Sequence, residues 1–301
     1  MSSPENNGLV FDSSTLTTFE RCPRLFYWRY VRHLSPVDVQ IPLSYGSALH
    51  EALHVWHDTH DIEEAVAMFH AHWTDLEHEK DRTADNGELL LRGYARKYAK
   101  EPFKIVSLEK HFDLPLGTYQ YCGRFDAVVH WDGQYYVMDH KHTKRLYGNY
   151  FRQYRPNLQM SGYAWAAQRI FDVPIAGLVI NLIHVTQKTV KGIDQGEPYQ
   201  RAFVSREPWE LDEFEQIAHA LMDRAVNLDQ EDRHAWPMCW SACNDYGGCS
   251  YRDLCMDTDP DSILDTQFVV RKWSPLDELT NPERQTLNKK HVRSLPKFWE
   301  I

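Results

Sequence analysis

The stretch IVSLEKHFDLPLGTYQYCGRFDAVVHWDGQYYVMDHK, residues 105–141, carries the pattern that decides the fold. Apolar and polar residues alternate along it in three runs, which predicts strands with one buried face. Asp132-Gly133 separates the second run from the third, and this pair is typical of a two-residue hairpin turn. The stretch therefore predicts an antiparallel meander with strands at residues 105–114, 118–131 and 134–140.

Helical periodicity surrounds this meander on both sides. Before it, we expect a helix at 13–34 that is capped by Ser13 or Ser14, and further helices at 45–60, 62–80 and 87–100. After it, helices are expected at 158–171 and 208–228, and strands at 178–185 and 199–204. Such alternation predicts an α/β protein in which helices flank a central mixed sheet.

The composition excludes several other classes of protein. The 301 residues are 43% apolar and 25% charged, which is typical of a globular chain that forms one large domain or two small ones. The longest apolar run, near 176–183, is shorter than a membrane helix, and residues 1–10 lack signal-peptide features. We therefore expect a cytoplasmic protein with reduced cysteines and no membrane contact. The net charge of −10 argues against a uniformly basic nucleic-acid surface but allows a local basic groove.

Acidic residues recur on the predicted strands, with Glu109 on the first, Asp126 on the second and Asp139 on the third. Two carboxylates at the same end of neighbouring strands can share a hard divalent cation such as Mg²⁺. Lys141 lies two residues beyond Asp139 and so faces the same side, where its ammonium could orient a water or stabilise negative charge. Asp126 lies among apolar strand positions, so its carboxylate needs a metal or a cationic partner. Taken alone, a D-x-K pattern is more often a pair of solvent-facing strand residues.

Four short patterns in a fixed order extend this cluster. They are Gly46-x-x-x-His50 on the early helix, GRFDAVV around Asp126, YYVMDHK ending in Asp139-x-Lys141, and Gln159-x-x-x-Tyr163 on one face of helix 158–171. As structure alone, Tyr163 would be a core residue and Gln159 a capping or surface residue. The ordered set, over about residues 13–256, resembles the RecB-like branch of the PD-(D/E)XK nuclease superfamily.

The resemblance implies a fold, a reaction and a set of site residues. The implied fold is a restriction-endonuclease-like core with N-terminal helical insertions, and the implied activity is Mg²⁺- or Mn²⁺-dependent hydrolysis of DNA phosphodiester bonds. The implied metal ligands are His50, Asp126, Asp139 and the backbone carbonyl of His140. By the same resemblance Lys141 is the catalytic lysine, and Gln159 and Tyr163 lie beside the bound DNA strand.

A pattern on the second predicted helix favours a different class of enzyme. The residues His50-Glu51-Ala52-Leu53-His54 form a literal H-E-x-x-H, in which the glutamate would be the general base of a zinc peptidase. His60 stands where the extended motif has its third ligand, but His57 stands where that motif needs a glycine. A zinc metallopeptidase is therefore kept as an alternative, although it leaves the strand carboxylates and the cysteines unexplained.

Five of the six cysteines fall in two short phrases, one around Cys22 and one at Cys239, Cys243, Cys249 and Cys255. Converging thiolates suit Zn²⁺ or an iron–sulfur cluster, and spacing alone hardly separates the two. The phrase CPRLFYWRYV around Cys22 resembles AddB-like and CRISPR-associated adaptation nucleases, in which one N-terminal cysteine joins three near the C-terminus. That resemblance implies a 4Fe-4S cluster on Cys22, Cys243, Cys249 and Cys255, with Cys239 as a substitute ligand because C-x5-C-x5-C departs from the usual spacing. The alternative is a set of independent free thiols.

The segment HKHTKRLYGNYFRQYR, residues 140–155, holds five Lys or Arg and no Asp or Glu, interleaved with aromatic residues. Basic side chains neutralise phosphates and aromatic rings stack on unpaired bases, so this composition indicates a path for single-stranded DNA. A solvated basic loop is the alternative. The candidate DNA-binding residues are Lys144, Arg145, Tyr150, Arg152, Tyr154 and Arg155.

We therefore expect a nuclease domain over residues 1–260, with a helical insertion at about 45–100 and an iron–sulfur cluster that joins its ends. A tail or small subdomain is expected at 261–301. The expected function is that of an exonuclease acting on DNA ends or single strands in recombination, repair or phage DNA processing. DNA is the expected partner, with a helicase or recombination protein as a further candidate. Besides the peptidase, the alternative function is a catalytically inert DNA-binding scaffold.

Overall fold

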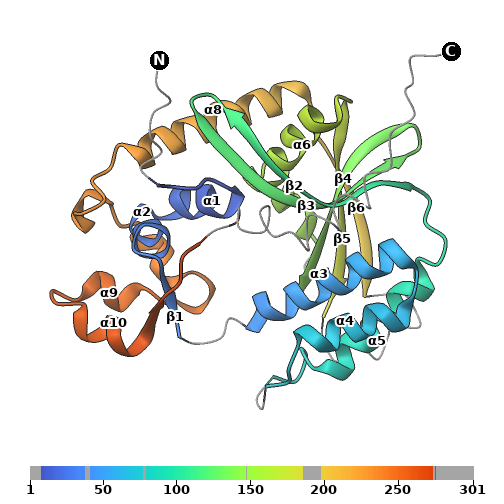
Figure 1. Ribbon diagram of the computed structural model, residues 1–301, viewed down its shortest axis with the longest axis horizontal. Coiled ribbons are helices and arrows are strands. Elements are labelled where there is room, and N and C mark those ends of the chain that lie inside the picture. Colours follow the sequence, from blue (N-terminus) through green and yellow to red (C-terminus); the bar gives the residue numbers. More distant parts are fainter. Residues whose placement is uncertain are drawn as a thin grey trace. The chain divides into compact units, whose positions relative to one another are not determined.

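A computed structural model describes residues 8–37, 41–76, 79–146, 148–185, 198–273 and 275 (Figure 1). The described chain forms two compact units, each assembled from segments that are far apart in the sequence. The first unit draws on residues 1–39, 111–123 and 209–281, and the second on residues 40–110, 124–208 and 282–301.

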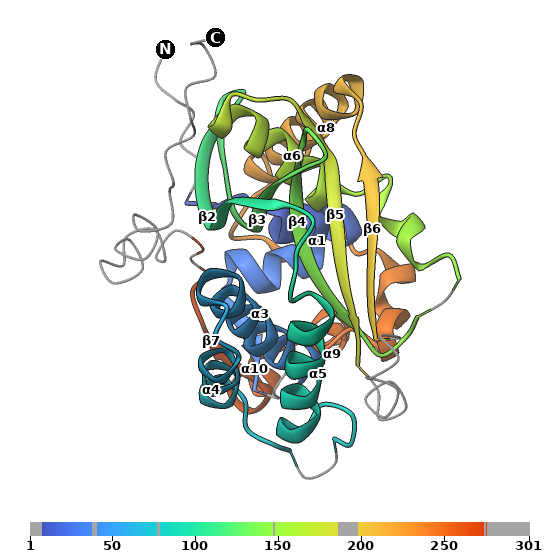
Figure 2. The same cartoon turned by 90° about the vertical axis from the view of Figure 1, so that its right-hand side faces the viewer.

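The strands form a five-stranded sheet in the order β2-β3-β4-β5-β6 (Figure 2). Their bounds are Lys104–Leu116 for β2, Tyr119–Trp131 for β3, Gln134–Thr143 for β4, Ile175–His184 for β5 and Tyr199–Ser205 for β6. The β4 strand pairs in parallel with β5, whereas the β3–β4 and β5–β6 pairs are antiparallel. The predicted mixed sheet flanked by helices is confirmed.

The turn between β3 and β4 sets the register on which the candidate site depends. Asp132 and Gly133 have φ values of 46° and 75°, and two successive positive φ angles are the signature of the type I′ hairpin turn. From this turn the pairing runs back to Ala127 opposite Met138. One further step along each strand brings Asp126 and Asp139 to neighbouring positions.

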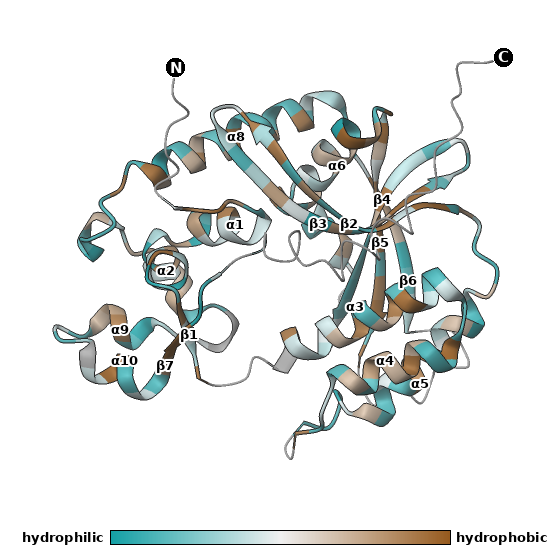
Figure 3. Cartoon of the chain, in the orientation of Figure 1, coloured by the Kyte–Doolittle hydropathy of each residue, from teal (hydrophilic) through white to brown (hydrophobic). Residues whose placement is uncertain are grey.

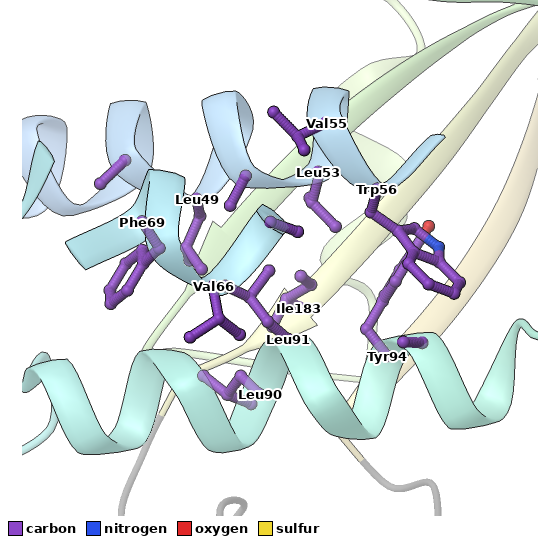
Figure 4. Close-up of a cluster of buried hydrophobic side chains, with 14 of the residues drawn as sticks. Leu49, Leu53, Val55, Trp56, Val66, Phe69, Leu90, Leu91, Tyr94 and Ile183 are labelled. Carbon is purple, nitrogen blue, oxygen red and sulfur yellow. The ribbon is translucent and has the colours of Figure 1, made fainter. Parts of the chain in front are cut away.

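Three helices of the second unit enclose a hydrophobic cluster together with β5 and β6 (Figure 4). They are α3 (Ile41–Thr59), α4 (Ile62–His72) and α5 (Ala84–Lys97). Each carries hydrophilic as well as hydrophobic residues (Figure 3), so one face can be buried while the other stays in water. The buried side chains include Leu49, Leu53, Val66, Phe69, Leu90, Leu91 and Ile183. Burying each of these side chains stabilises the folded protein by about 1.5–3 kcal/mol relative to leaving it exposed. The cluster therefore keeps α3 packed against the sheet.

Helix α6 (Leu158–Phe171) connects β4 to β5 and packs against both strands. A parallel strand pair requires such a crossover. The helix begins where the Asn157 side chain accepts a hydrogen bond from the Met160 N–H, and it ends at Asp172 in the left-handed conformation. These bounds match the prediction of a helix at 158–171.

The first unit contains helices and a cluster of aromatic side chains. They are α1 (Ser13–Arg21), α2 (Pro23–Phe26), α8 (Pro208–Val226), α9 (Arg252–Met256) and α10 (Asp261–Gln267). The fully buried Trp236 stacks on Phe26, with an edge contact to Phe19 and a tilted contact to Tyr27. Strand β1 (Leu34–Pro36) pairs antiparallel with β7 (Phe268–Val270).

The prediction of one continuous helix over 13–34 is wrong. Cys22 is extended, with φ of −162° and ψ of 106°, and Pro23 opens a new helix because a proline has no N–H to continue the old one. A π-helical turn at Tyr27–Val31 and strand β1 follow. The cap of the first helix is Asp12, whose carboxylate accepts from the Thr15 N–H, rather than Ser13 or Ser14.

Two other predicted helices have different bounds. The helix predicted at 62–80 ends at His72, where Trp73 is extended, and the helix predicted at 87–100 begins earlier, after the Thr83 cap. Within the described residues, no helix is long and apolar enough to cross a membrane. Residues 276–301 lie outside the described residues, so the predicted domain boundary near residue 260 stays a prediction.

Candidate active site

Three elements of the second unit bring the predicted site residues together. His50 lies on α3, Asp126 on β3, and Asp139 and Lys141 on β4. The Nδ1 atom of His50 is 3.2 Å from Asp126 Oδ1. The Nζ atom of Lys141 is 2.7 Å from Asp139 Oδ2, which agrees with the expectation that these two side chains share one strand face.

The Asp126 side chain accepts a backbone hydrogen bond at the position where the backbone pairing of β3 with β4 ends. The pairing of the two strands ends at Ala127 opposite Met138, and beyond it the His140 N–H donates a 2.6 Å hydrogen bond to Asp126 Oδ2. A side-chain carboxylate therefore takes the place of a backbone acceptor. Its two oxygens are divided between the His140 backbone and the His50 ring, so Asp126 links α3, β3 and β4.

The charges of these groups depend on one another because they lie close together and are buried or half-buried. Burial alone would raise the pKa of Asp126, but His50 and the His140 backbone lower it overall, so this carboxylate is ionised. Burial would lower the pKa of His50, but the carboxylates of Asp126 and Asp139 raise it overall. Burial raises the pKa of Asp139 even though the Lys141 ammonium opposes that shift. For Lys141, the effect of Asp139 outweighs burial and raises the pKa.

The donor chemistry of the site fits a hard divalent cation. Asp139 Oδ2 is buried and makes no hydrogen bond of good geometry, so its contact is the ion pair with Lys141. Across the part of the chain that the structure describes, no three His, Cys, Asp or Glu side chains converge closely enough to hold a metal by themselves. Two carboxylates, supplemented by a backbone carbonyl and waters, are what Mg²⁺ commonly uses in proteins.

The predicted pair on α6 reaches the same site. Lys141 Nζ donates to Gln159 Oε1 at 3.2 Å, and Gln159 Nε2 donates to the Tyr163 hydroxyl at 3.1 Å. Residues four apart on a helix share a face, which explains why both point toward β4. The half-buried Tyr163 ring also meets the buried ring of Phe125 edge-on.

Sequence reasoning missed Arg124, which lies two residues before Asp126 and so on the same strand face. Its Nε atom is 2.9 Å from Glu109 Oε2, and its Nη1 atom is 3.9 Å from Glu51 Oε1. Glu109 has a φ of 45°, an uncommon conformation for a non-glycine residue, and burial raises its pKa to about 8. The period-two rule, applied to GRFDAVV, could have found Arg124.

The first two residues of the H-E-x-x-H pattern, and His57 after it, face different partners in the structure. His50 contacts Asp126, and Glu51 lies on the side of Arg124. His57 is buried, with its Nε2 3.2 Å from the Tyr94 hydroxyl and its ring stacked on His140. As at the strand carboxylates, no three His, Cys, Asp or Glu side chains among the described residues converge at this motif closely enough to hold a metal.

The residues of the basic segment 140–155 differ in exposure and in the groups that they contact. Lys144 Nζ lies 3.1 Å from Glu79 and 2.7 Å from Asp81, so two carboxylates balance its charge. Tyr154 is buried, and its hydroxyl donates to that of the half-buried Tyr150 at 3.0 Å. The guanidinium-bearing residues of the segment are exposed; they are Arg145, Arg152 and Arg155.

Five cysteines line one pocket within the first unit, although Cys22 is more than 200 residues away from the others in sequence. The lining cysteines are Cys22, Cys239, Cys243, Cys249 and Cys255, all with free thiols. Trp28 donates its indole N–H to Cys255 Sγ at 3.3 Å, and the Cys239 N–H donates to Cys22 Sγ at 3.4 Å. Cys122 is buried elsewhere and donates to the Phe11 carbonyl.

Comparison with known proteins gives one family and a set of similar solved structures. The family model described as the PD-(D/E)XK nuclease superfamily matches residues 13–256. A solved structure from Eubacterium rectale named "Putative exonuclease" is 12% identical, with a TM-score of 0.50, over 88% of this chain and 96% of that one. A second, named SSO0001, is 11% identical, with a TM-score of 0.31, over 70% and 84% of the two chains. No curated protein matches the sequence.

The Gly46→Ala substitution tests how α3 reaches the site. A Cβ atom on Gly46 would overlap the ring of His142 on β4, so the glycine is what allows this close approach. We expect the substitution to lower the free energy of unfolding by about 1–3 kcal/mol, as overpacking does, in urea denaturation followed by fluorescence. Gly148→Ala is the control, because a Cβ there meets nothing within 4 Å. Equal stability of the two variants would show that α3 and His142 can separate freely.

Proposed function

The chain belongs to the PD-(D/E)XK nuclease superfamily, and we propose that it is a Mg²⁺- or Mn²⁺-dependent deoxyribonuclease that hydrolyses phosphodiester bonds at DNA ends or in single strands. This proposal rests on one observation. His50, Asp126 and the Asp139–Lys141 pair lie together at the position where the backbone pairing of β3 with β4 ends. Membership of the family makes the chain a nuclease and hence a hydrolase of phosphodiester bonds. DNA as substrate is part of the proposal.

His50, Asp126, Asp139 and the backbone carbonyl of His140 are the residues that would hold the metal. A bound divalent cation supplies a water of lowered pKa and charge stabilisation at a phosphoryl oxygen. The Asp126 carboxylate is held on both sides before any substrate arrives, so its orientation does not have to be created during the reaction. Lys141 keeps its ammonium charged beside Asp139, where it can orient the attacking water or stabilise the negative charge that develops on the phosphate.

Gln159 and Tyr163 extend this arrangement toward the substrate. Their hydrogen bonds join Lys141 to α6, which gives the lysine a defined direction. Because an amide and a phenol can both donate to phosphate oxygens, we place the DNA strand beside these two side chains. Exonuclease action, with a role in recombination, repair or phage DNA processing, and a helicase or recombination partner, completes the proposal. It is supported by the name of the Eubacterium rectale structure and by the sequence patterns.

The cysteine pocket is proposed to hold a 4Fe-4S cluster on Cys22, Cys243, Cys249 and Cys255. Thiolates are the donors that such clusters use, and these four cysteines line the same pocket. The buried Arg24 guanidinium, which donates from Nε to the Trp236 carbonyl, places a positive charge near Cys22 and Cys255. Cys239 lines the same pocket and remains the substitute ligand.

The proposed DNA path runs along the exposed arginines Arg145, Arg152 and Arg155, with Tyr150 as the stacking residue. The Tyr154 hydroxyl donates a hydrogen bond to the Tyr150 hydroxyl and so helps to hold the Tyr150 side chain in place. Lys144, which sequence reasoning also assigned to DNA, contributes less in this proposal because Glu79 and Asp81 already neutralise it.

Asp139→Asn and Lys141→Ala should each lower the cleavage rate by ~10²-fold or more, because one removes a metal ligand and the other removes a charge that stabilises the transition state. The measurement is digestion of end-labelled single- and double-stranded DNA with Mg²⁺, Mn²⁺ or EDTA. Glu51→Gln is the control and should retain most activity. An inactive Glu51→Gln variant beside an active Asp139→Asn variant would contradict the assignment of Asp139 as a metal ligand.

Anaerobically purified protein should be brown, with broad absorbance near ~400 nm from thiolate-ligated iron. Cys22→Ser and Cys249→Ser should lose the colour and most of the soluble yield, since cluster binding contributes folding energy. Cys122→Ser should keep the colour because Cys122 lies outside the pocket. Colourless wild-type protein with stoichiometric zinc would refute the iron assignment.

Removing Arg145 and Arg152 together should flatten the salt dependence of single-strand binding by about 1.4, at roughly 0.7 per phosphate contact. Lys144→Ala should change the slope much less, and exposed Lys104→Ala on β2 is the matched control for a lost charge. Tyr150→Ala should weaken binding by ~1–3 kcal/mol without changing the slope, because stacking is not ionic. Fluorescence anisotropy in Ca²⁺ measures both quantities. Unchanged affinity and slope in every variant would place DNA elsewhere.

A further inference from the structure

A row of polar residues crosses the buried side of the sheet behind the site. His140 on β4 is directly opposite Asn181 on β5, and Asn181 is directly opposite Arg201 on β6. Figure 2 shows these three strands side by side. Asn181 is fully buried and His140 is 4% exposed. The row ends at Glu101, which forms two short hydrogen bonds with the Arg201 guanidinium, of 2.6 and 2.7 Å.

The row has one consistent hydrogen-bonding direction. Arg201 has only donors, and its Nε donates to Asn181 Oδ1 at 2.9 Å, which fixes the orientation of the Asn181 amide. The amide nitrogen therefore points the other way, donating to His140 Nδ1 at 2.7 Å and to the Tyr94 hydroxyl at 3.0 Å. His140 Nδ1 must accept, so its ring proton lies on Nε2.

Tyr94 closes the row from the side of α5. Its hydroxyl accepts from Asn181 and, at 2.9 Å, from Arg201 Nη2, and it lies 3.2 Å from His57 Nε2. The His57 ring in turn stacks on the His140 ring, with centroids 5.4 Å apart and planes within 9°. The His140 ring is thus held at one nitrogen by Asn181 and across one face by His57.

We propose that Asn181, itself held by Arg201 and Glu101, is a positioning residue that holds the His140 ring and thereby the His140 backbone at the metal site. This inference rests on the proposed function, in which the His140 carbonyl is a metal ligand. The His140 N–H is already bonded to Asp126 at 2.6 Å, and its neighbours in sequence are Asp139 and Lys141. Successive side chains of a strand point to opposite faces, so the ring is anchored on the face away from those two residues.

Stability alone is a weak reason for such a row. A buried ion pair with its hydrogen-bonded partners is often no more stable than apolar residues of similar volume. Two steps earlier, on the same face of the sheet, the corresponding row carries only apolar residues, which are Met138, its partner Val179 on β5 and Phe203 opposite that on β6. The polar row coincides with His140, whose backbone N–H donates to Asp126. Groups that orient a metal ligand from behind typically change metal affinity 10–100-fold when they are removed.

The test compares Mn²⁺ binding by wild-type protein, Asn181→Ala and Asn181→Asp, by EPR titration without DNA. Asn181→Ala frees the ring and should weaken Mn²⁺ binding roughly tenfold, with cleavage largely restored at saturating Mn²⁺. Asn181→Asp keeps an anchor, because the new carboxylate can accept a hydrogen bond from His140 when Nδ1 carries the ring proton. It should bind Mn²⁺ more tightly than Asn181→Ala. Ser161→Ala, which removes a buried hydrogen bond from Arg206 Nε, is the control for lost stability and should leave Mn²⁺ affinity unchanged.

A spectroscopic measurement keeps the inference testable if Asn181→Ala does not fold. In ¹⁵N spectra of the wild-type protein, His140 should appear as the neutral tautomer protonated on Nε2, and in Asn181→Asp its Nδ1 atom should carry a proton. A wild-type His140 protonated on Nδ1 would overturn the inference.

The possible outcomes distinguish failure of the positioning role of Asn181 from failure of the proposed function. Mn²⁺ binding that is lost in Asp139→Asn but unchanged in Asn181→Ala would refute the positioning role and leave the metal site standing. Equal losses in Asn181→Ala and Ser161→Ala would also refute it, since general destabilisation would then explain both. Absence of Mn²⁺ binding by the wild-type protein would refute the proposed function and the inference together.

Discussion

The hydrogen bond from the His140 N–H to the Asp126 carboxylate is the interaction on which the site depends. It forms where the β3–β4 pairing stops, so a backbone donor that would otherwise be unpaired in the interior is satisfied by a side chain. The second oxygen of Asp126 contacts the His50 ring, so α3 also meets the two strands at this position. One carboxylate therefore joins three elements, and the cluster of α3, α4 and α5 supplies the hydrophobic burial that keeps α3 in place.

Around this point, three buried or half-buried ion pairs occur. Lys141 faces Asp139, Arg124 faces Glu109, and Arg201 faces Glu101. Taking such groups out of water is costly unless partners and hydrogen bonds compensate, which is why they occur as pairs. The same burial makes the site rigid, because moving one member would leave the other uncompensated. A preorganised set of charges is what the hydrolysis of a phosphodiester requires, since little reorganisation then remains for the reaction itself.

Much of the architecture could be predicted because it is encoded locally. Alternation along 105–141 predicts the strands, Asp132-Gly133 predicts the hairpin, and i,i+4 spacing places Gln159 and Tyr163 on one helix face. The helix predicted over 13–34 failed for an equally local reason, because Pro23 cannot continue the hydrogen bonding of α1 and Cys22 becomes extended. Bounds such as the end of α4 at His72 depend on packing partners that periodicity does not reveal.

By itself the sequence determined the fold class, the family patterns and which face of each strand bears the carboxylates, because periods of 2.0 and 3.6 are properties of neighbouring residues. Only the tertiary structure decided which charges are paired and which are exposed. Lys144 is neutralised by Glu79 and Asp81, more than 60 residues away, while Arg145 beside it is exposed. The alignment of His140, Asn181 and Arg201 likewise follows from the registers of β4, β5 and β6. A register is a relation between distant segments, set by turns and packing, and no local pattern contains it.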